Sequence, residues 1–200
     1  MINTEKRGFT LLELLIVIGI LAILGTVTVL VLNPAELFRQ ARDSQRVENM
    51  SSMRSAIGLY TATVSNPDLD FTGALSCSTM CFTGASGVGA NCGQLRHATS
   101  TKTTTIDTTR ESDGNGWIPV NLAAIPGGAP LASLPVDPIN DTTYYFSYAC
   151  DNTNKTFELN ANMESTRYST TGGDDVESNA KDGGDLESIY EIGTDPGLNL

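Results

Sequence analysis

The chain has 200 residues, enough for one domain with an anchor or tail and too few for several domains. It carries 12 Lys and Arg against 23 Asp and Glu, a formal net charge of −11. Because contacts to phosphates need a basic patch, this balance argues against direct nucleic-acid binding. The sequence has one histidine and shows no nucleophile–base pair, nucleotide loop or cofactor motif, so neither an enzyme nor a resident cofactor is expected.

Residues 9–32 form an apolar run in which Glu13 is the only charged residue. At about 1.5 Å rise per residue, a helix of this length crosses a bilayer core of about 30 Å. The basic pair at residues 6–7 predicts a cytoplasmic N-terminus and an exported remainder. A carboxylate deep in lipid costs on the order of 3 kcal/mol, so Glu13 needs a partner. A cut between Gly8 and Phe9 would supply one, the new α-amino group.

Residues 6–13 read KRGFTLLE and lead directly into the apolar run. This pattern resembles the prepilin signal that type IV pilins share with type II secretion pseudopilins. The resemblance implies that a prepilin peptidase cuts after Gly8 and methylates the new terminus, Phe9. It also implies that Glu13 pairs with the amine of a neighbouring subunit while the helices pack into a fibre.

The same resemblance implies a sequence of locations and partners. The subunit is expected to sit first in the cytoplasmic membrane as a single-pass protein and later in an extracytoplasmic, cell-surface fibre. Its expected partners are the membrane before assembly, prepilin peptidase, a membrane-embedded assembly platform, and other copies of itself in a homopolymer.

Four regions are expected along the chain: a leader at residues 1–8, a transmembrane and assembly helix at residues 9–32, an amphipathic helix at residues 33–65, and an extracytoplasmic head at residues 66–200 with an acidic, Gly-rich C-terminal region. The predicted fold class is α+β, with the long N-terminal helix packed on a small antiparallel sheet. Proline at position 34 predicts a kink or local unwinding where the two helical regions join.

Within residues 33–65, apolar side chains recur at three- to four-residue steps, which predicts an amphipathic helix. We expect this stripe to pack on the sheet of its own head rather than on another subunit. The stripe consists of Leu37, Phe38, Ala41, Val47, Met50, Met53, Ile57, Tyr60 and Val64. The polar face is expected to carry Arg39, Arg42, Asp43, Arg46, Glu48 and Arg54.

Residues 143–150 and 155–161 are β-prone and flank turn residues, so they predict an antiparallel hairpin. Aromatic side chains on its first strand share one face and are expected to cover the helix rather than to bind a sugar or nucleotide; they are Tyr144, Phe146 and Tyr148. Residues 117–120 are expected to form a short edge strand, residues 99–109 an exposed strand or a loop, and residues 188–192 a last short strand.

All four cysteines would lie outside the membrane, where disulfides persist. They are Cys77, Cys81, Cys92 and Cys150, and the sequence does not choose among the three possible pairings. A Cys3His zinc site that uses the first three together with His97 is an alternative, and it would leave Cys150 unpaired.

Carboxylates alternate with glycines near the C-terminus, a composition that suits Ca²⁺ because hard cations take oxygen ligands on a sharply turning backbone. The candidate ligands are Asp174, Asp175, Asp182 and Asp185. Major pseudopilins place calcium in a C-terminal loop, although their ligands do not align with these residues. A solvated acidic loop is the alternative.

The expected function is therefore that of a structural subunit of a type IV pilus-like fibre. A pseudopilin of a type II secretion system is the first alternative. A minor pilin that acts as an adhesin or a DNA receptor is the second, and a membrane-anchored domain that never polymerises is the third.

Overall fold

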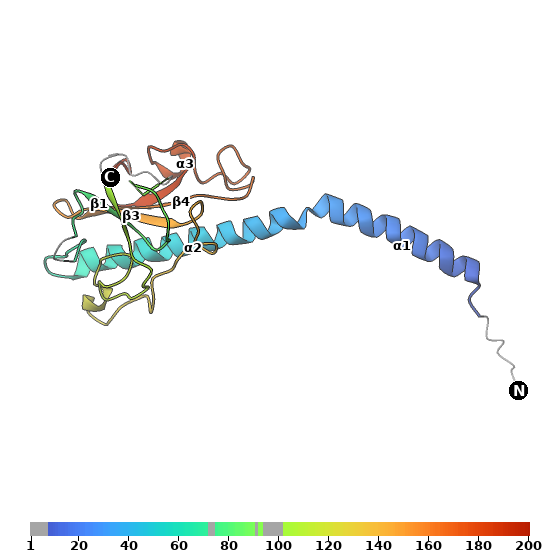
Figure 1. Ribbon diagram of the computed structural model, residues 1–200, viewed down its shortest axis with the longest axis horizontal. Coiled ribbons are helices and arrows are strands. Elements are labelled where there is room, and N and C mark those ends of the chain that lie inside the picture. Colours follow the sequence, from blue (N-terminus) through green and yellow to red (C-terminus); the bar gives the residue numbers. More distant parts are fainter. Residues whose placement is uncertain (1–7, 72–74, 91, 94–101) are drawn as a thin grey trace, which may run out of the picture. The chain divides into compact units, whose positions relative to one another are not determined.

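The computed structural model describes residues 8–71, 75–90, 92–93 and 102–200. The chain divides into two compact units, residues 1–38 and 39–200 (Figure 1). The first unit contains helix α1, Leu11–Leu32, whose side chains are exposed along its whole described length. By length and composition this apolar helical region could cross a membrane.

Helix α1 ends at Leu32 and helix α2, Pro34–Thr63, begins two residues later. Between them Asn33 adopts the left-handed conformation, with φ of 39°. Proline at the next position lacks an N–H and disfavours the α conformation in the residue before it. The predicted interruption at this point is confirmed, and it is confined to one residue.

The head contains a five-stranded sheet with the order β2-β1-β3-β4-β5. Its strands are β1 Met80–Thr83, β2 Thr103–Ile106, β3 Phe146–Asp151, β4 Thr156–Ala161 and β5 Tyr190–Gly193. β1 and β2 are parallel, and the other neighbours are antiparallel. Two short helices, η1 Leu122–Ala124 and α3 Asn179–Asp182, complete the described elements.

The predicted α+β fold is confirmed, and the β3–β4 hairpin lies where the sequence placed it. Residues 188–192 were expected to contain the last strand, and β5 occupies nearly the same positions. The segment 99–109 contains edge strand β2, while residues 99–101 lie outside the described part of the chain.

The predicted apolar stripe of α2 packs on the sheet only in its later part, because its first three members, Leu37, Phe38 and Ala41, are exposed. Met50, Met53 and Ile57 are at most 1% exposed and join one core cluster with the inward side chains of β3 and β4. Fully burying a side chain of this size contributes roughly 1.5–3 kcal/mol. The aromatic face of the hairpin contributes to the same core: Phe146 and Tyr148 are buried, whereas Tyr144 is only half-buried.

The prediction of a strand at residues 117–120 is wrong. This segment is an irregular loop whose Trp117, Ile118 and Val120 are buried in the core. The indole Nε1 of Trp117 donates to the carbonyl of Pro135 at 3.0 Å. Neighbouring side chains that are all buried do not show the inward–outward alternation of an edge strand, and Pro119 has no N–H for a ladder.

The prediction of a solvent-facing polar side for α2 is wrong at Asp43 and Arg46, which are both 0% exposed. The guanidinium of Arg46 donates to Asp137 at 2.6 and 2.9 Å and to Asp43 at 2.7 Å. It also pairs with Glu164 at 2.5 Å, and Arg42 forms a second, two-pronged pair with the same carboxylate.

This buried ionic cluster connects three parts of the head. Burial by itself would lower the pKa of Arg46, but hydrogen bonds and charges from Asp137, Asp43 and Glu164 raise it overall. The carboxylate of Asp43 also accepts backbone N–H bonds from Glu164 and Ser165, at 3.0 and 2.7 Å. The cluster therefore holds α2 against the loop at Asp137 and the segment that follows β4.

Replacing Arg46 with methionine should destabilise the head by about 3–5 kcal/mol, because the change leaves buried carboxylates without their cation. Urea unfolding of the full chain in detergent micelles, followed by tryptophan fluorescence, measures this loss. Arg54→Met is the matched control on the same helix, since Arg54 is exposed and donates one bond to Gly193. Equal unfolding midpoints for the two variants would contradict the structural role of the cluster.

Candidate functional site

The start of α1 is a capping box formed by Thr10 and Glu13. Thr10 is the N-cap residue, with φ of −81° and ψ of 150°. Its hydroxyl accepts the N–H of Glu13 at 3.2 Å, and its amide donates to the Glu13 carboxylate at 3.0 Å. The hydroxyl also donates to the same carboxylate oxygen, at 2.8 Å. Such a box satisfies N–H groups that have no partner within the helix.

The predicted cleavage site lies immediately before this box. Gly8 and Phe9 are exposed and precede the first residue of α1, and the Phe9 side chain is 84% exposed. A peptide bond in this setting requires no helix to open before a protease reaches it. The basic residues Lys6 and Arg7 lie outside the described residues.

Among the described residues of its own unit, 8–38, the apolar surface of α1 has no partner. Its large hydrophobic side chains are 46–83% exposed along the helix, from Leu11 to Leu32. An apolar surface of this extent requires lipid or other apolar helices around it. Glu13 is the only charged residue on this helix, so the same surroundings must also accommodate a carboxylate.

The cysteines form two disulfides, Cys77–Cys150 and Cys81–Cys92. The zinc alternative is therefore wrong, because each of its three cysteines is bonded to another cysteine. Its fourth expected ligand, His97, lies outside the described residues. The first bridge joins the segment before β1 to the end of β3, and the second fixes the loop that follows β1.

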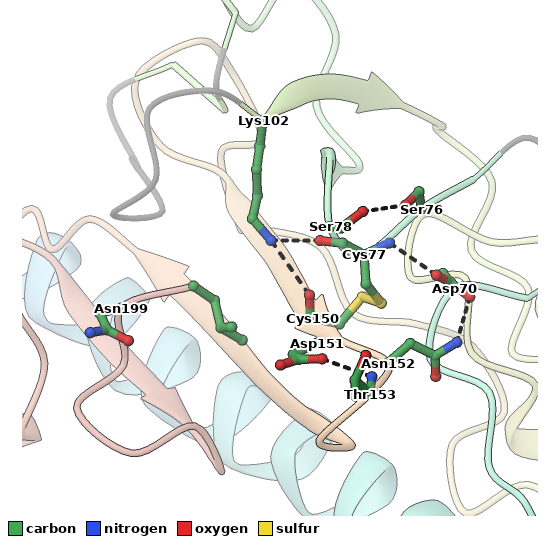
Figure 2. A pocket seen from close by; sticks show the side chains of 11 residues that line it. Asp70, Ser76, Cys77, Ser78, Lys102, Cys150, Asp151, Asn152, Thr153 and Asn199 are labelled. Atoms are coloured by element: carbon green, nitrogen blue, oxygen red, sulfur yellow. Dashed lines mark hydrogen bonds between the residues drawn. A yellow bond between two sulfur atoms is a disulfide. The ribbon is translucent and has the colours of Figure 1, made fainter.

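A pocket of about 520 Å³ lies beside the Cys77–Cys150 disulfide (Figure 2). Lys102 reaches into its wall and is only 4% exposed. Its ammonium donates to the carbonyl oxygens of Cys77 and Cys150, at 2.7 and 3.4 Å. Asp70, on another wall, accepts the N–H of Cys77 at 2.9 Å.

These contacts identify Lys102 as a support for the disulfide-bonded strands. Burial lowers the pKa of Lys102, although the charges of Glu158, Asp151 and Asp195 oppose this effect. Two of its three donors are directed at main-chain carbonyls rather than at a ligand. Sequence analysis missed this residue, since a single lysine in a Thr-rich stretch gives no signal of burial.

The predicted calcium ligands Asp174, Asp175 and Asp182 make an ion pair or hydrogen bonds with neighbouring residues of the head. Asp174 pairs with Arg167 at 2.5 Å. Asp175 accepts N–H bonds from Thr171, Glu177 and Ser178, and Asp182 accepts them from Gly184 and Glu191. Asp185 is exposed. Within the described residues no group of three or more His, Cys, Asp or Glu side chains is placed to hold a metal ion. Calcium at these positions stays a prediction.

Two buried glutamates in this region were missed. Glu177 accepts the N–H groups of Met163 and Thr170, at 2.8 and 3.0 Å. Glu191 is 1% exposed, and its Oε2 accepts the N–H of Leu186 at 2.8 Å. Burial, with the charges of nearby carboxylates, raises the pKa of Glu191 to about 8. Alternation along β5 places Glu191 on the face opposite to Tyr190 and Ile192, which pack against the core, so the sequence pattern gave no signal of its burial.

Comparison with known proteins identifies the N-terminal segment. Residues 4–29 match the family model described as the prokaryotic N-terminal methylation motif, which is the prepilin signal. No curated protein and no solved structure is significantly similar to the chain. This motif is the signal that type IV pilins and pseudopilins share, and the long N-terminal helix and five-stranded sheet form a pilin-like α+β fold.

The raised pKa of Glu191 predicts that the head loses stability as the pH rises from about 4.5 to about 8. The folded-state pKa of Glu191 exceeds its ordinary value of 4.5. The contribution of the protonated carboxyl to the free energy of unfolding is therefore fully present below pH 4.5 and is lost as the pH rises through about 8. Glu191→Gln, which stays neutral, should raise the urea midpoint at pH 9 and leave it little changed at pH 5. Glu187→Gln removes an exposed carboxylate from the same segment and is the control. Parallel pH profiles for wild type and Glu191→Gln would contradict the prediction.

Proposed function

We propose that this chain is a structural subunit of a type IV pilus-like fibre. Prepilin peptidase cleaves it between Gly8 and Phe9 and methylates the new terminus, and the subunit then polymerises through α1. The observation that carries this proposal is a single carboxylate, Glu13, at the start of an exposed apolar helix that bears the methylation motif. Neither a plain membrane anchor nor a secretion signal needs a charge at that position.

The apolar side chains of α1 need apolar surroundings, and its carboxylate needs a cationic partner; a fibre of packed helices supplies both. Before assembly, lipid surrounds its apolar side chains and the head lies on the far side of the cytoplasmic membrane from the N-terminus. In the fibre, other copies of α1 replace the lipid, and the amine of Phe9 in one subunit pairs with Glu13 of its neighbour. This pairing satisfies both charges in an apolar core, so it favours one register of subunits over others.

The alternative within the same family is a pseudopilin of a type II secretion system, which uses the same signal and the same pairing. The two differ in where the fibre ends. A pilus projects from the cell and is recovered by shearing, whereas a pseudopilus stays within the envelope. We propose that the chain is a pilus subunit, and a measurement of its amount in the sheared surface fraction would distinguish the two.

Replacing Glu13 with valine should abolish fibres while leaving membrane insertion and head folding intact, because the change removes the partner of the amine and the acceptor of the capping box, neither of which belongs to the head. Fibre yield is measured by electron microscopy and by immunoblotting of sheared and membrane fractions. Glu48→Gln is the matched control, since Glu48 is an exposed carboxylate on α2. Normal fibres from Glu13→Val would remove the proposed role of this residue.

A further inference from the structure

The capping box leaves the two oxygens of the Glu13 carboxylate in different situations. Oε2 accepts two hydrogen bonds, from the amide and the hydroxyl of Thr10, at 3.0 and 2.8 Å. Among the described residues no hydrogen bond reaches Oε1. A carboxylate oxygen can accept more than one bond, so Oε1 retains its full capacity for another donor.

The donors that hold Oε2 are unaffected by processing. A cut between Gly8 and Phe9 turns the nitrogen of Phe9 into an amine, whereas the amide of Thr10 is one peptide bond further along and stays intact. The hydroxyl of Thr10 is equally untouched. The groups that form the box are therefore present both in the precursor and in the mature subunit.

We infer that Thr10 positions Glu13 for assembly: it keeps one carboxylate oxygen bonded within the subunit and directs the other toward the amine of an incoming neighbour. This inference rests on the proposed fibre function. It names the residue that orients Glu13 for its pairing with the amine of the neighbouring subunit. Thr10 acts through Glu13 and is a positioning residue.

Two physical effects support this role. In a bilayer no water is present to solvate the carboxylate, so donors within the subunit lower the penalty for holding Glu13 there before assembly. The same bonds restrict the side-chain torsions of Glu13 to the capping geometry, so less conformational entropy is lost when the neighbour binds.

Other threonines of the same helix behave differently. The hydroxyls of Thr26 and Thr28 donate to the carbonyls of Ala22 and Leu24, four residues earlier, at 2.8 and 2.7 Å. Those bonds satisfy the hydroxyls themselves and involve no charged group. Thr28 therefore provides a matched control, a threonine on α1 with no contact to Glu13.

The test compares fibre assembly by Thr10→Val, Thr10→Ser and Thr28→Val. Yield is normalised to the amount of cleaved and methylated chain, measured by mass spectrometry of the N-terminal peptide. Thr10→Val keeps the branched shape and loses the hydroxyl, so assembly should fall about fivefold, the factor that corresponds to losing a typical N-cap bond. Thr10→Ser restores the hydroxyl and should restore assembly, and Thr28→Val should assemble normally.

Wild-type assembly by Thr10→Val, or an equal loss in Thr28→Val, would overturn the inference while leaving the fibre function in place. Failure of the wild-type chain itself to form fibres would instead contradict the proposed function. Should Thr10→Val resist cleavage, the Thr10 amide proton is followed by NMR in the full chain in micelles. Glu13→Gln should move that resonance upfield, since a neutral acceptor binds the amide more weakly, and an unchanged resonance would equally overturn the inference.

Discussion

The structure depends on one constraint: a carboxylate placed within an apolar helix must have a partner wherever that helix resides. Glu13 meets this constraint at the helix start, where the amide and hydroxyl of Thr10 bind it. Those donors satisfy one oxygen, and the α-amino group released by processing can satisfy the other. Under the proposed function, the same residue would be tolerated in the membrane and best accommodated in a polymer, which would favour transfer of the subunit from lipid to fibre.

The head also contains a buried charge, and partners within the head itself neutralise it. Arg46 is a buried cation surrounded by Asp43, Asp137 and Glu164, and every bond it makes is internal to the head. Two disulfides and the ammonium of Lys102 fix the loops around β1 and β3. All of these contacts lie within the unit formed by residues 39–200.

The features that the sequence predicted correctly are those that depend on neighbours in the chain. The signal at residues 6–13, the interruption at Asn33 and the β3–β4 hairpin each follow from adjacent residues. The polar side of α2 was mispredicted because charge was taken to mean exposure. Yet Asp43 and Arg46 continue the same three- and four-residue spacing as the buried methionines that follow them. Their burial depends on Asp137 and Glu164, which lie about a hundred residues away, and no local pattern reveals such partners. The sequence left the disulfide pairing open for the same reason, since Cys77 and Cys150 are 73 residues apart and no local pattern reveals that they meet.

The most direct measurement of the central claim is the mass of the N-terminal peptide of the protein taken from its native membrane and from the sheared surface fraction. We predict a chain that begins at Phe9, carries one added methyl group, and is abundant in the sheared fraction. A chain that still begins at Met1, in cells that process other prepilins, would contradict the account, because the nitrogen of Phe9 would then remain an amide and could not pair with Glu13 as an amine.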